Sequence, residues 1–355
     1  SVCLPSRRPP VRDRRTAPHF SLLFAFYLLL FVNMPIKIVL ILLFILASCG
    51  GGSSSESSIT NNIDTINPST EEQCSLYQSR IYKCEFIHNS IDRYYYIQLQ
   101  HPDAEGQSSV LFNLHGYGSN ALQQMTYTNF NNLANTKENN FILIHPQGAP
   151  LNTVLTSSSS HWNSGGWTVG STVDDVDFID TIIELVSQKY DLNQNRIYST
   201  GMSNGGFMSY HLACNLSSKI AAVASVTGSM SFETYESCNP SHPTAILQVH
   251  GTIDVTVPFQ GNSTLGMRSI NDVMDYWKVY NACDVDPSSI ITDYFDIEIA
   301  VQHDTYSNCL NDVHVELYKI EGMGHTWPYK GRYGISATEI IWEFINTYDI
   351  NGTID

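Results

Sequence analysis

A serine at the centre of a glycine-rich stretch is the first group in this sequence that could do chemistry. The stretch reads YSTGMSNGGF and places Ser203 between Gly201 and Gly205, directly after an apolar run. The spacing G-x-S-x-G is typical of a sharp strand-to-helix turn that exposes a serine hydroxyl. Glycines suit such a turn because a Cβ atom would block the close approach of neighbouring chain segments. We therefore expect Ser203 to act as a nucleophile.

A carboxylate and a histidine follow in the order that such a serine needs. The segment VHGTIDVTVPF puts Asp254 just beyond one apolar run, and EGMGHTWP puts His325 beyond a later one. A serine hydroxyl is a poor nucleophile until a base takes its proton, so His325 is the candidate base. Asp254 would then orient the imidazole. The order Ser, Asp, His is that of α/β-hydrolases and differs from the chymotrypsin and subtilisin orders.

Acyl transfer also requires two N–H donors that stabilise the oxyanion of the tetrahedral intermediate. The residue after the nucleophile, Asn204, supplies one candidate backbone N–H. The segment LHGYGSN supplies the other at Tyr117, next to Gly116. We expect these two groups to form an oxyanion hole.

Alternating strands and helices would position these groups. Apolar runs alternate with helical periodicity from about residue 88, and the segment VDDVDFIDTIIELVSQ shows helical spacing at Val176, Ile179 and Ile183. Asp174 or Asp175 is expected to cap that helix rather than to form an acid/base or metal pair. Further helices are expected over residues 121–134, 205–213, 270–280 and 337–350. The alternation predicts an α/β fold with a mostly parallel central sheet and helices on both faces.

Seven motifs together make the chain resemble a known family. They are LHGYGSN, HPQG, WNSGGW, VDDVDFI, GMSNGGFMSY, HGTIDVTVPF and GMGHTWP. The set looks like that of secreted esterases related to polyhydroxybutyrate depolymerases and feruloyl esterases, a carbohydrate esterase family 1-like group of α/β-hydrolases. The resemblance covers roughly residues 85–347. It implies ester hydrolysis by Ser203, Asp254 and His325, with no metal and no cofactor.

Six cysteines remain when Cys3 and Cys49 are set aside: Cys74, Cys84, Cys214, Cys238, Cys283 and Cys309. Pairing neighbours along the chain would give Cys74–Cys84, Cys214–Cys238 and Cys283–Cys309, although six cysteines allow fifteen pairings. The family resemblance implies the second and third of these pairs. No CxxC spacing is present, so a zinc site is the poorer alternative.

Three tryptophans are candidates for the substrate pocket. Trp162 and Trp167 lie in a glycine-rich loop, and Trp327 lies two residues after His325. They are expected to form an aromatic wall, with ordinary loop anchoring as the alternative. His115 and His250 precede glycines at expected strand ends, and we expect them to be hydrogen-bonded structural groups.

The first 73 residues predict export. Residues 1–33 are expected to be an upstream extension, residues 34–48 a lipoprotein signal peptide, and residues 49–73 a Gly/Ser-rich tether. LASC resembles a lipobox, which makes Cys49 the expected lipidation site. Residues 74–355 would then form one catalytic domain of an exported bacterial lipoprotein, membrane-anchored or secreted. The alternative is an uncleaved membrane anchor made of both apolar runs.

The net charge of the chain bears on which kinds of partner it can bind. Acidic residues number 34 against 18 basic ones, a net charge of −16, which disfavours a nucleic-acid partner. The sequence therefore predicts a monomeric serine esterase that acts through an acyl-enzyme on feruloyl or aryl esters or on polyhydroxyalkanoate-type polyesters. Two alternatives are a serine peptidase of the same fold and a non-catalytic polymer-binding surface lipoprotein.

Overall fold

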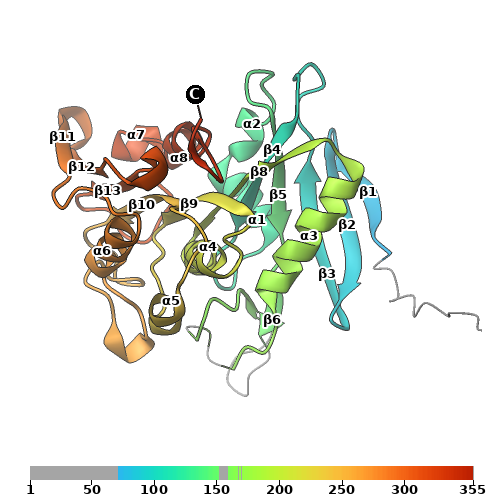
Figure 1. Cartoon of the computed structure of the whole chain (residues 1–355), viewed down its shortest axis with the longest axis horizontal. Helices are drawn as coiled ribbons and strands as arrows, with labels where there is room; N and C mark the ends of the chain where they lie inside the picture. Colours follow the sequence, from blue (N-terminus) through green and yellow to red (C-terminus); the bar gives the residue numbers. More distant parts are fainter. Residues whose placement is uncertain (1–70, 152–158, 167, 169, 355) are drawn as a thin grey trace, which may run out of the picture. The chain divides into compact units, whose positions relative to one another are not determined.

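The computed structural model describes residues 71–151, 159–166, 168 and 170–354, and an eleven-stranded sheet runs through this part of the chain (Figure 1). The order of the strands across the sheet is β1-β2-β3-β5-β4-β8-β9-β10-β13-β12-β11. Their bounds are β1 Gln73–Gln78, β2 Ile81–His88, β3 Ile91–Gln98, β4 Ser108–Leu114, β5 Phe141–Pro146, β8 Leu192–Met202, β9 Ile220–Val226, β10 Ala245–Gly251, β11 Ser288–Tyr294, β12 Ile299–Tyr306 and β13 Val315–Ile320.

The centre of the sheet is parallel and both flanks are antiparallel. Strands β5, β4, β8, β9, β10 and β13 pair in parallel. Strands β1, β2 and β3 extend one side antiparallel, and β12 and β11 extend the other. The predicted α/β architecture is confirmed. Because the central strands are parallel, their carboxyl ends lie along one edge, where sites form in such sheets.

Helices cover both faces of the central strands. Val110 and Phe112 of β4 belong to one apolar core and Leu111 to the other, as the two-residue period of a strand requires. The first core includes side chains of α3 (Asp175–Lys189), α4 (Asn204–Asn215) and α6 (Ile270–Tyr280). The second includes side chains of α2 (Phe130–Leu133) and α8 (Ala337–Ile345). Figure 1 shows α3 lying across the strands of the sheet.

The remaining elements are short. The other helices are α1 (Ala121–Thr128), α5 (Phe232–Ser237) and α7 (Lys330–Tyr333). Two small hairpins pair β6 (Ala149–Leu151) with β7 (Ser159–His161) and β14 (Tyr348–Asp349) with β15 (Gly352–Thr353). Single 3₁₀ turns occupy Ser263–Leu265, Phe295–Ile297 and Leu310–Asp312.

Local sequence explains most helix boundaries. Asp174 caps α3 by accepting a hydrogen bond from the Asp177 backbone N–H at 2.9 Å. The helix expected over residues 270–280 is found as α6, which begins with a capping box between Ser269 and Asp272. The single helix expected over residues 121–134 is wrong, because Asn129 adopts a left-handed conformation with φ 59° and separates α1 from α2. The last helix ends at Ile345, earlier than expected.

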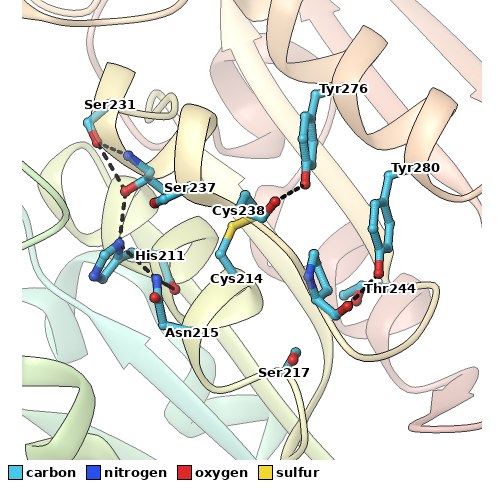
Figure 2. The surroundings of a disulfide bond; sticks show 12 residues. His211, Cys214, Asn215, Ser217, Ser231, Ser237, Cys238, Thr244, Tyr276 and Tyr280 are labelled. Carbon is cyan, nitrogen blue, oxygen red and sulfur yellow. Dashed lines mark hydrogen bonds between the residues drawn. A yellow bond between two sulfur atoms is a disulfide. The ribbon is translucent and has the colours of Figure 1, made fainter.

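Three disulfides link cysteines that are neighbours along the chain: Cys74–Cys84, Cys214–Cys238 and Cys283–Cys309. Figure 2 shows the second, which ties the last turn of α4 to the residue after α5. The Tyr276 hydroxyl donates to the carbonyl oxygen of Cys238 at 2.9 Å, so α6 also holds this corner. Helix α4 is thereby fixed to two neighbouring helices.

The predicted upstream extension (1–33), signal peptide (34–48), lipidation site Cys49 and most of the tether (49–73) lie outside the described residues. Among the residues that the structure does describe, no helix has the length and apolar character needed to cross a membrane.

Candidate active site

Ser203 sits on a strained turn between β8 and α4. Its backbone has φ 55° and ψ −122°, a conformation that residues with a Cβ adopt at a cost. A Cβ built on Gly201 would lie 2.5 Å from the carbonyl carbon of Gly205, and one on Gly205 would lie 2.2 Å from the Leu114 carbonyl oxygen. Glycine at both positions therefore lets strands β4 and β8 and helix α4 meet directly around the serine.

Asp254 and His325 form a hydrogen-bonded pair beyond the ends of β10 and β13. His325 Nδ1 lies 2.8 Å from Asp254 Oδ2. The other carboxylate oxygen accepts the backbone N–H groups of Thr256 at 2.9 Å and Val257 at 3.0 Å. Burial by itself would raise the pKa of Asp254, but the hydrogen bonds from His325 and Val257 outweigh it and hold the pKa below its usual value. The carboxylate is thus ionised at neutral pH and fixes the imidazole through Nδ1.

Ser203 and His325 line the same cavity, which has a volume of about 920 Å³. Apolar and aromatic side chains form much of its wall, among them Leu122, Tyr127 and Trp327. The hydrogen bonds of the described residues do not include one between Ser203 Oγ and His325. Such bonds between catalytic groups often tighten only when substrate is bound. The cavity brings the nucleophile and the base of the predicted triad together.

The two expected oxyanion donors lie beside Ser203. A Cβ built on Gly116 would be 3.5 Å from Ser203 Cβ, so the loop that continues to Tyr117 packs against the nucleophile. Asn204 is the first residue of α4, where a backbone N–H has no partner within the helix. Tyr117 also lines the cavity. Tyr117 therefore shares the cavity with Ser203, and Asn204 adjoins Ser203 in the chain, while the oxyanion hole itself stays a prediction.

The Asn204 side chain is clamped to the backbone of Trp162. Its Oδ1 accepts the Trp162 N–H at 2.7 Å, and its Nδ2 donates to the Trp162 carbonyl at 3.0 Å. Nδ2 also lies 3.3 Å from Ser164 Oγ. Asn204 is completely buried. The first turn of the nucleophile helix is thus held by the loop that follows β7.

The expectation that Trp162 forms a pocket wall is wrong. Its side chain is fully buried and is absent from the lining of the cavity. The indole N–H donates to the His115 carbonyl at 2.9 Å, so Trp162 supports the loop that carries Tyr117. Trp167 lies outside the described residues. Trp327 does line the cavity, and its ring makes a T-shaped contact with that of Phe130.

Tyr127 is a site residue that the sequence did not single out. Its hydroxyl lies 2.7 Å from Thr326 Oγ1 and accepts the Trp327 N–H at 3.0 Å. Its ring also lines the cavity. Helix α1 therefore holds the two residues that follow His325. The only signal in the sequence was that this helix directly follows the Gly116–Tyr117 loop.

Asp175 has a different role from the one expected. It does not cap α3 but forms a buried ion pair, with Oδ1 2.7 Å from Arg93 Nη2. Its Oδ2 accepts the Asn163 N–H at 2.8 Å. The same Arg93 nitrogen donates to the Gln147 carbonyl at 3.2 Å. This pair anchors the chain next to Trp162, and nothing in the local sequence indicated it.

The two histidines expected to be structural are hydrogen-bonded and buried. His115 Nδ1 donates to the Gly116 carbonyl at 2.8 Å, and Nε2 accepts the Gly148 N–H at 3.0 Å. His250 Nε2 donates to the Val257 carbonyl at 2.8 Å. Burial lowers the pKa of each to about 4, so both imidazoles are neutral at pH 7. They shape the Tyr117 and Asp254 loops.

Glu72, Cys74 and Cys84 are the one group of metal-ligating residue types that lies close enough together within the described part of the chain. The two sulfurs are bonded to each other, so neither is a thiolate that could bind zinc.

A family model with the description Phospholipase/Carboxylesterase matches residues 96–278, which is 183 of the 355 residues. The chain belongs to this family. The matched segment contains Ser203 and Asp254 and ends before His325. This match confirms that the chain belongs to the α/β-hydrolase esterases, as the motifs predicted.

Curated relatives of this family member are esterases. A bifunctional acetylxylan esterase/xylanase of Neocallimastix patriciarum is 25% identical over 70% of this chain and 32% of its own length. Feruloyl esterase B of Piromyces equi is 29% identical over 52% of this chain and 34% of its own length. The chain thus spans about a third of the length of these two relatives.

One solved structure shows the same fold. The acetyl xylan esterase from Aspergillus awamori aligns with a TM-score of 0.52 at 14% identity, over 72% of this chain and 94% of that one.

Proposed function

We propose that this chain is a serine-dependent carboxylic-ester hydrolase. The observation that carries the proposal is the Asp254–His325 hydrogen bond of 2.8 Å at a cavity that also contains the strained Ser203. Membership of a phospholipase/carboxylesterase family supports ester chemistry at this site. A binding protein would have no need of a serine and a histidine at one cavity with a carboxylate bonded to the histidine.

The geometry supports an acyl-enzyme mechanism. His325 Nε2 takes the proton of Ser203 Oγ as the oxygen attacks the ester carbonyl carbon, and the carbonyl π electrons move onto the oxygen. The backbone N–H groups of Asn204 and Tyr117 stabilise that oxyanion. Its collapse breaks the C–O bond to the alcohol, which leaves with the proton from His325. Water then attacks the acyl-enzyme, again through His325, and releases the carboxylic acid.

The cavity wall favours an aromatic acyl group. Tyr117, Tyr127, Trp327 and Tyr329 all contribute to it, and flat rings offer a large apolar area to a phenolic acid. The named activities of the relatives, feruloyl and acetylxylan esterase, support esters on plant polysaccharides. Exposed Ile253 and Val255, on either side of Asp254, favour a second candidate, an apolar polyester.

A release assay on the full chain tests the proposal. Methyl ferulate, 3-hydroxybutyrate oligomers, p-nitrophenyl butyrate and a peptide p-nitroanilide would be compared, with Ser203→Ala as control. We expect turnover of the esters that requires Ser203, with methyl ferulate first. A preference for hydroxybutyrate oligomers would select the polyesterase. Turnover of the anilide alone would select the peptidase, and no turnover dependent on Ser203 would overturn the proposal.

Lipid attachment at Cys49 is a separate proposal, supported by the LASC motif and the Gly/Ser tract that follows it. Mass spectrometry of the protein purified from membranes tests it. We expect an N-terminal peptide that begins with a lipidated Cys49, and an unmodified Cys49 within a longer chain would contradict it.

A further inference from the structure

A second cavity, of about 510 Å³, adjoins the Asp254 loop. Asp254, Thr252 and Phe259 contribute to its wall, as do Lys319 and Glu321 at the end of β13. Thr252 directly follows β10, and Glu321 directly follows β13. Because β10 and β13 are parallel, the cavity lies at the same edge of the sheet as Ser203 and His325. The two cavities therefore flank the Asp254–His325 pair.

The sheet face behind this second cavity combines three polar side chains with one leucine. Gln302 of β12 pairs with Lys319 of β13, and Asp304 pairs with Leu317, so all four side chains stand on one face. All four line the cavity. Leu317 belongs to the apolar core that includes α6, whereas Gln302, Asp304 and Lys319 place polar groups beside it. A polar face next to a cavity suits contact with a polar molecule rather than with a covering helix.

Several polar groups at this cavity make no hydrogen bond or ion pair to the residues that the structure describes. Among the described residues, no ion pair involves Lys319 or Glu321, and Lys319 Nζ lies 5.6 Å from the centre of the Phe259 ring. The exposed side chains of Gln260 and Asn271, which also line the cavity, make no hydrogen bonds to other described residues. One ammonium group, one carboxylate and two amides therefore face the cavity with free donors and acceptors.

The charges exclude some ligand classes. Its wall includes one cation, Lys319, and three carboxylates, those of Asp254, Asp304 and Glu321. An anionic ligand would meet net negative charge, and an aliphatic ligand would leave the polar groups desolvated without partners. A neutral polyol satisfies them, because each hydroxyl can donate to a carboxylate or amide oxygen and accept from an ammonium or amide N–H.

We propose that this second cavity binds neutral sugar units of a polysaccharide that carries the ester. The inference rests on the proposed ester hydrolysis, and it assigns the acyl and alcohol sides of the substrate to different cavities. The acyl group occupies the aromatic cavity at Ser203, and the sugar chain on the alcohol side extends past His325 into the cavity at Lys319 and Glu321.

Calorimetric titration of the full chain carrying Ser203→Ala with xylohexaose tests this assignment without turnover. We expect saturable binding that Lys319→Met and Glu321→Gln each weaken at least tenfold. Lys137→Met is the matched control, because Lys137 is exposed in the loop before β5, at the opposite edge of the sheet. We expect Lys137→Met to bind within twofold of its parent.

The two proposals fail differently. Absence of saturable binding, or equal binding by all three variants, would overturn the sugar site even if p-nitrophenyl butyrate is hydrolysed in a Ser203-dependent way. If xylohexaose binding is lost only in the Lys319 and Glu321 variants, the sugar site is supported, whether or not an ester is hydrolysed. If in addition no ester is hydrolysed, only the proposed hydrolase activity is overturned.

Discussion

Tyr127 and Trp327 are 200 residues apart in the sequence, yet the Tyr127 hydroxyl accepts the Trp327 backbone N–H at 3.0 Å. The same hydroxyl lies 2.7 Å from Thr326 Oγ1. Trp327 is held again at its indole N–H, which lies 3.1 Å from Thr338 Oγ1. One helix that lines the cavity thus also fixes the loop that carries His325.

Tyr127→Phe should separate the two roles of this side chain. The ring remains in the cavity wall, so KM for an aromatic ester should stay within about twofold, while loss of the hydroxyl loosens the His325 loop and lowers kcat by about tenfold or more. Tyr127→Leu should lower kcat and also raise KM. Steady-state kinetics with methyl ferulate measure both. An unchanged kcat in Tyr127→Phe would show that the hydroxyl does not position His325.

Asn204→Ala should reduce both stability and activity. It removes the clamp on Trp162 and leaves the buried Trp162 N–H unpaired, at a cost of about 1–3 kcal/mol, while the Trp162 carbonyl still accepts from the Thr168 hydroxyl. Asn281 is the matched control, because its amide makes the same two-point clamp on Thr244, at 3.0 and 2.7 Å, before β10 begins. Asn281→Ala should lose at least as much stability in urea, because it leaves both Thr244 groups unpaired, but should keep kcat in the folded enzyme. Equal loss of kcat in both variants would argue against a role of the clamp at the site.

Acid should destabilise the fold through buried histidines. Burial lowers the pKa of His115 and His250 to about 4 and that of His145 to about 3, against about 6.5 in the unfolded chain. Between those values the unfolded chain binds more protons, so the stability conferred by the neutral histidines is complete above pH 6.5 and is lost as the pH falls toward 4. In this pH range each buried histidine lowers the free energy of unfolding by about 1.4 kcal/mol for every unit by which the pH falls.

Urea unfolding at pH 4.5 to 7.5 measures this dependence. Neither ring nitrogen of His145 has a hydrogen-bond partner among the described residues. His145→Leu should therefore lower the slope of the unfolding free energy against pH by about one proton. It should cost little stability at pH 7. A free energy of unfolding that stays constant or rises on acidification would contradict the neutral state of these histidines.

The disulfides should differ in their importance. Cys214 and Cys238 are 24 residues apart, and their link restricts the unfolded chain by about 3 kcal/mol. Replacing both with alanine should lower the urea midpoint and release α5 from the nucleophile helix (Figure 2). The Cys74–Cys84 pair spans 10 residues and joins an exposed edge strand, so the same double replacement should cost less. The reverse ranking would contradict this account.

Local patterns explain why part of the site was predictable. The spacing of Gly201, Ser203 and Gly205 defines a turn by itself, and Asp254 and His325 each follow an apolar strand. The clamp of Asn204 on Trp162 and the Arg93–Asp175 pair join distant segments, which no local pattern records. An aromatic residue in a glycine-rich loop has the same local sequence whether it is exposed or buried, so the burial of Trp162 was not visible.

The flanks of the sheet were missed for a different reason. Strands β1 and β11 are exposed along almost their whole length. They carry neither the apolar run of a buried strand nor the alternation of a half-buried one, so the sequence gives no strand signal there. The parallel centre was predictable because β4, β5, β9 and β10 are buried along their whole length, on both faces.

Covalent labelling of Ser203 is the most direct test of the central claim. The full chain would be treated with a fluorophosphonate, and the adduct would be located by peptide mass spectrometry in the wild type, Ser203→Ala and His325→Ala. We expect one adduct, on Ser203, absent in Ser203→Ala and formed at least a hundredfold more slowly in His325→Ala. An unlabelled Ser203, or labelling at the same rate without His325, would contradict the proposed triad.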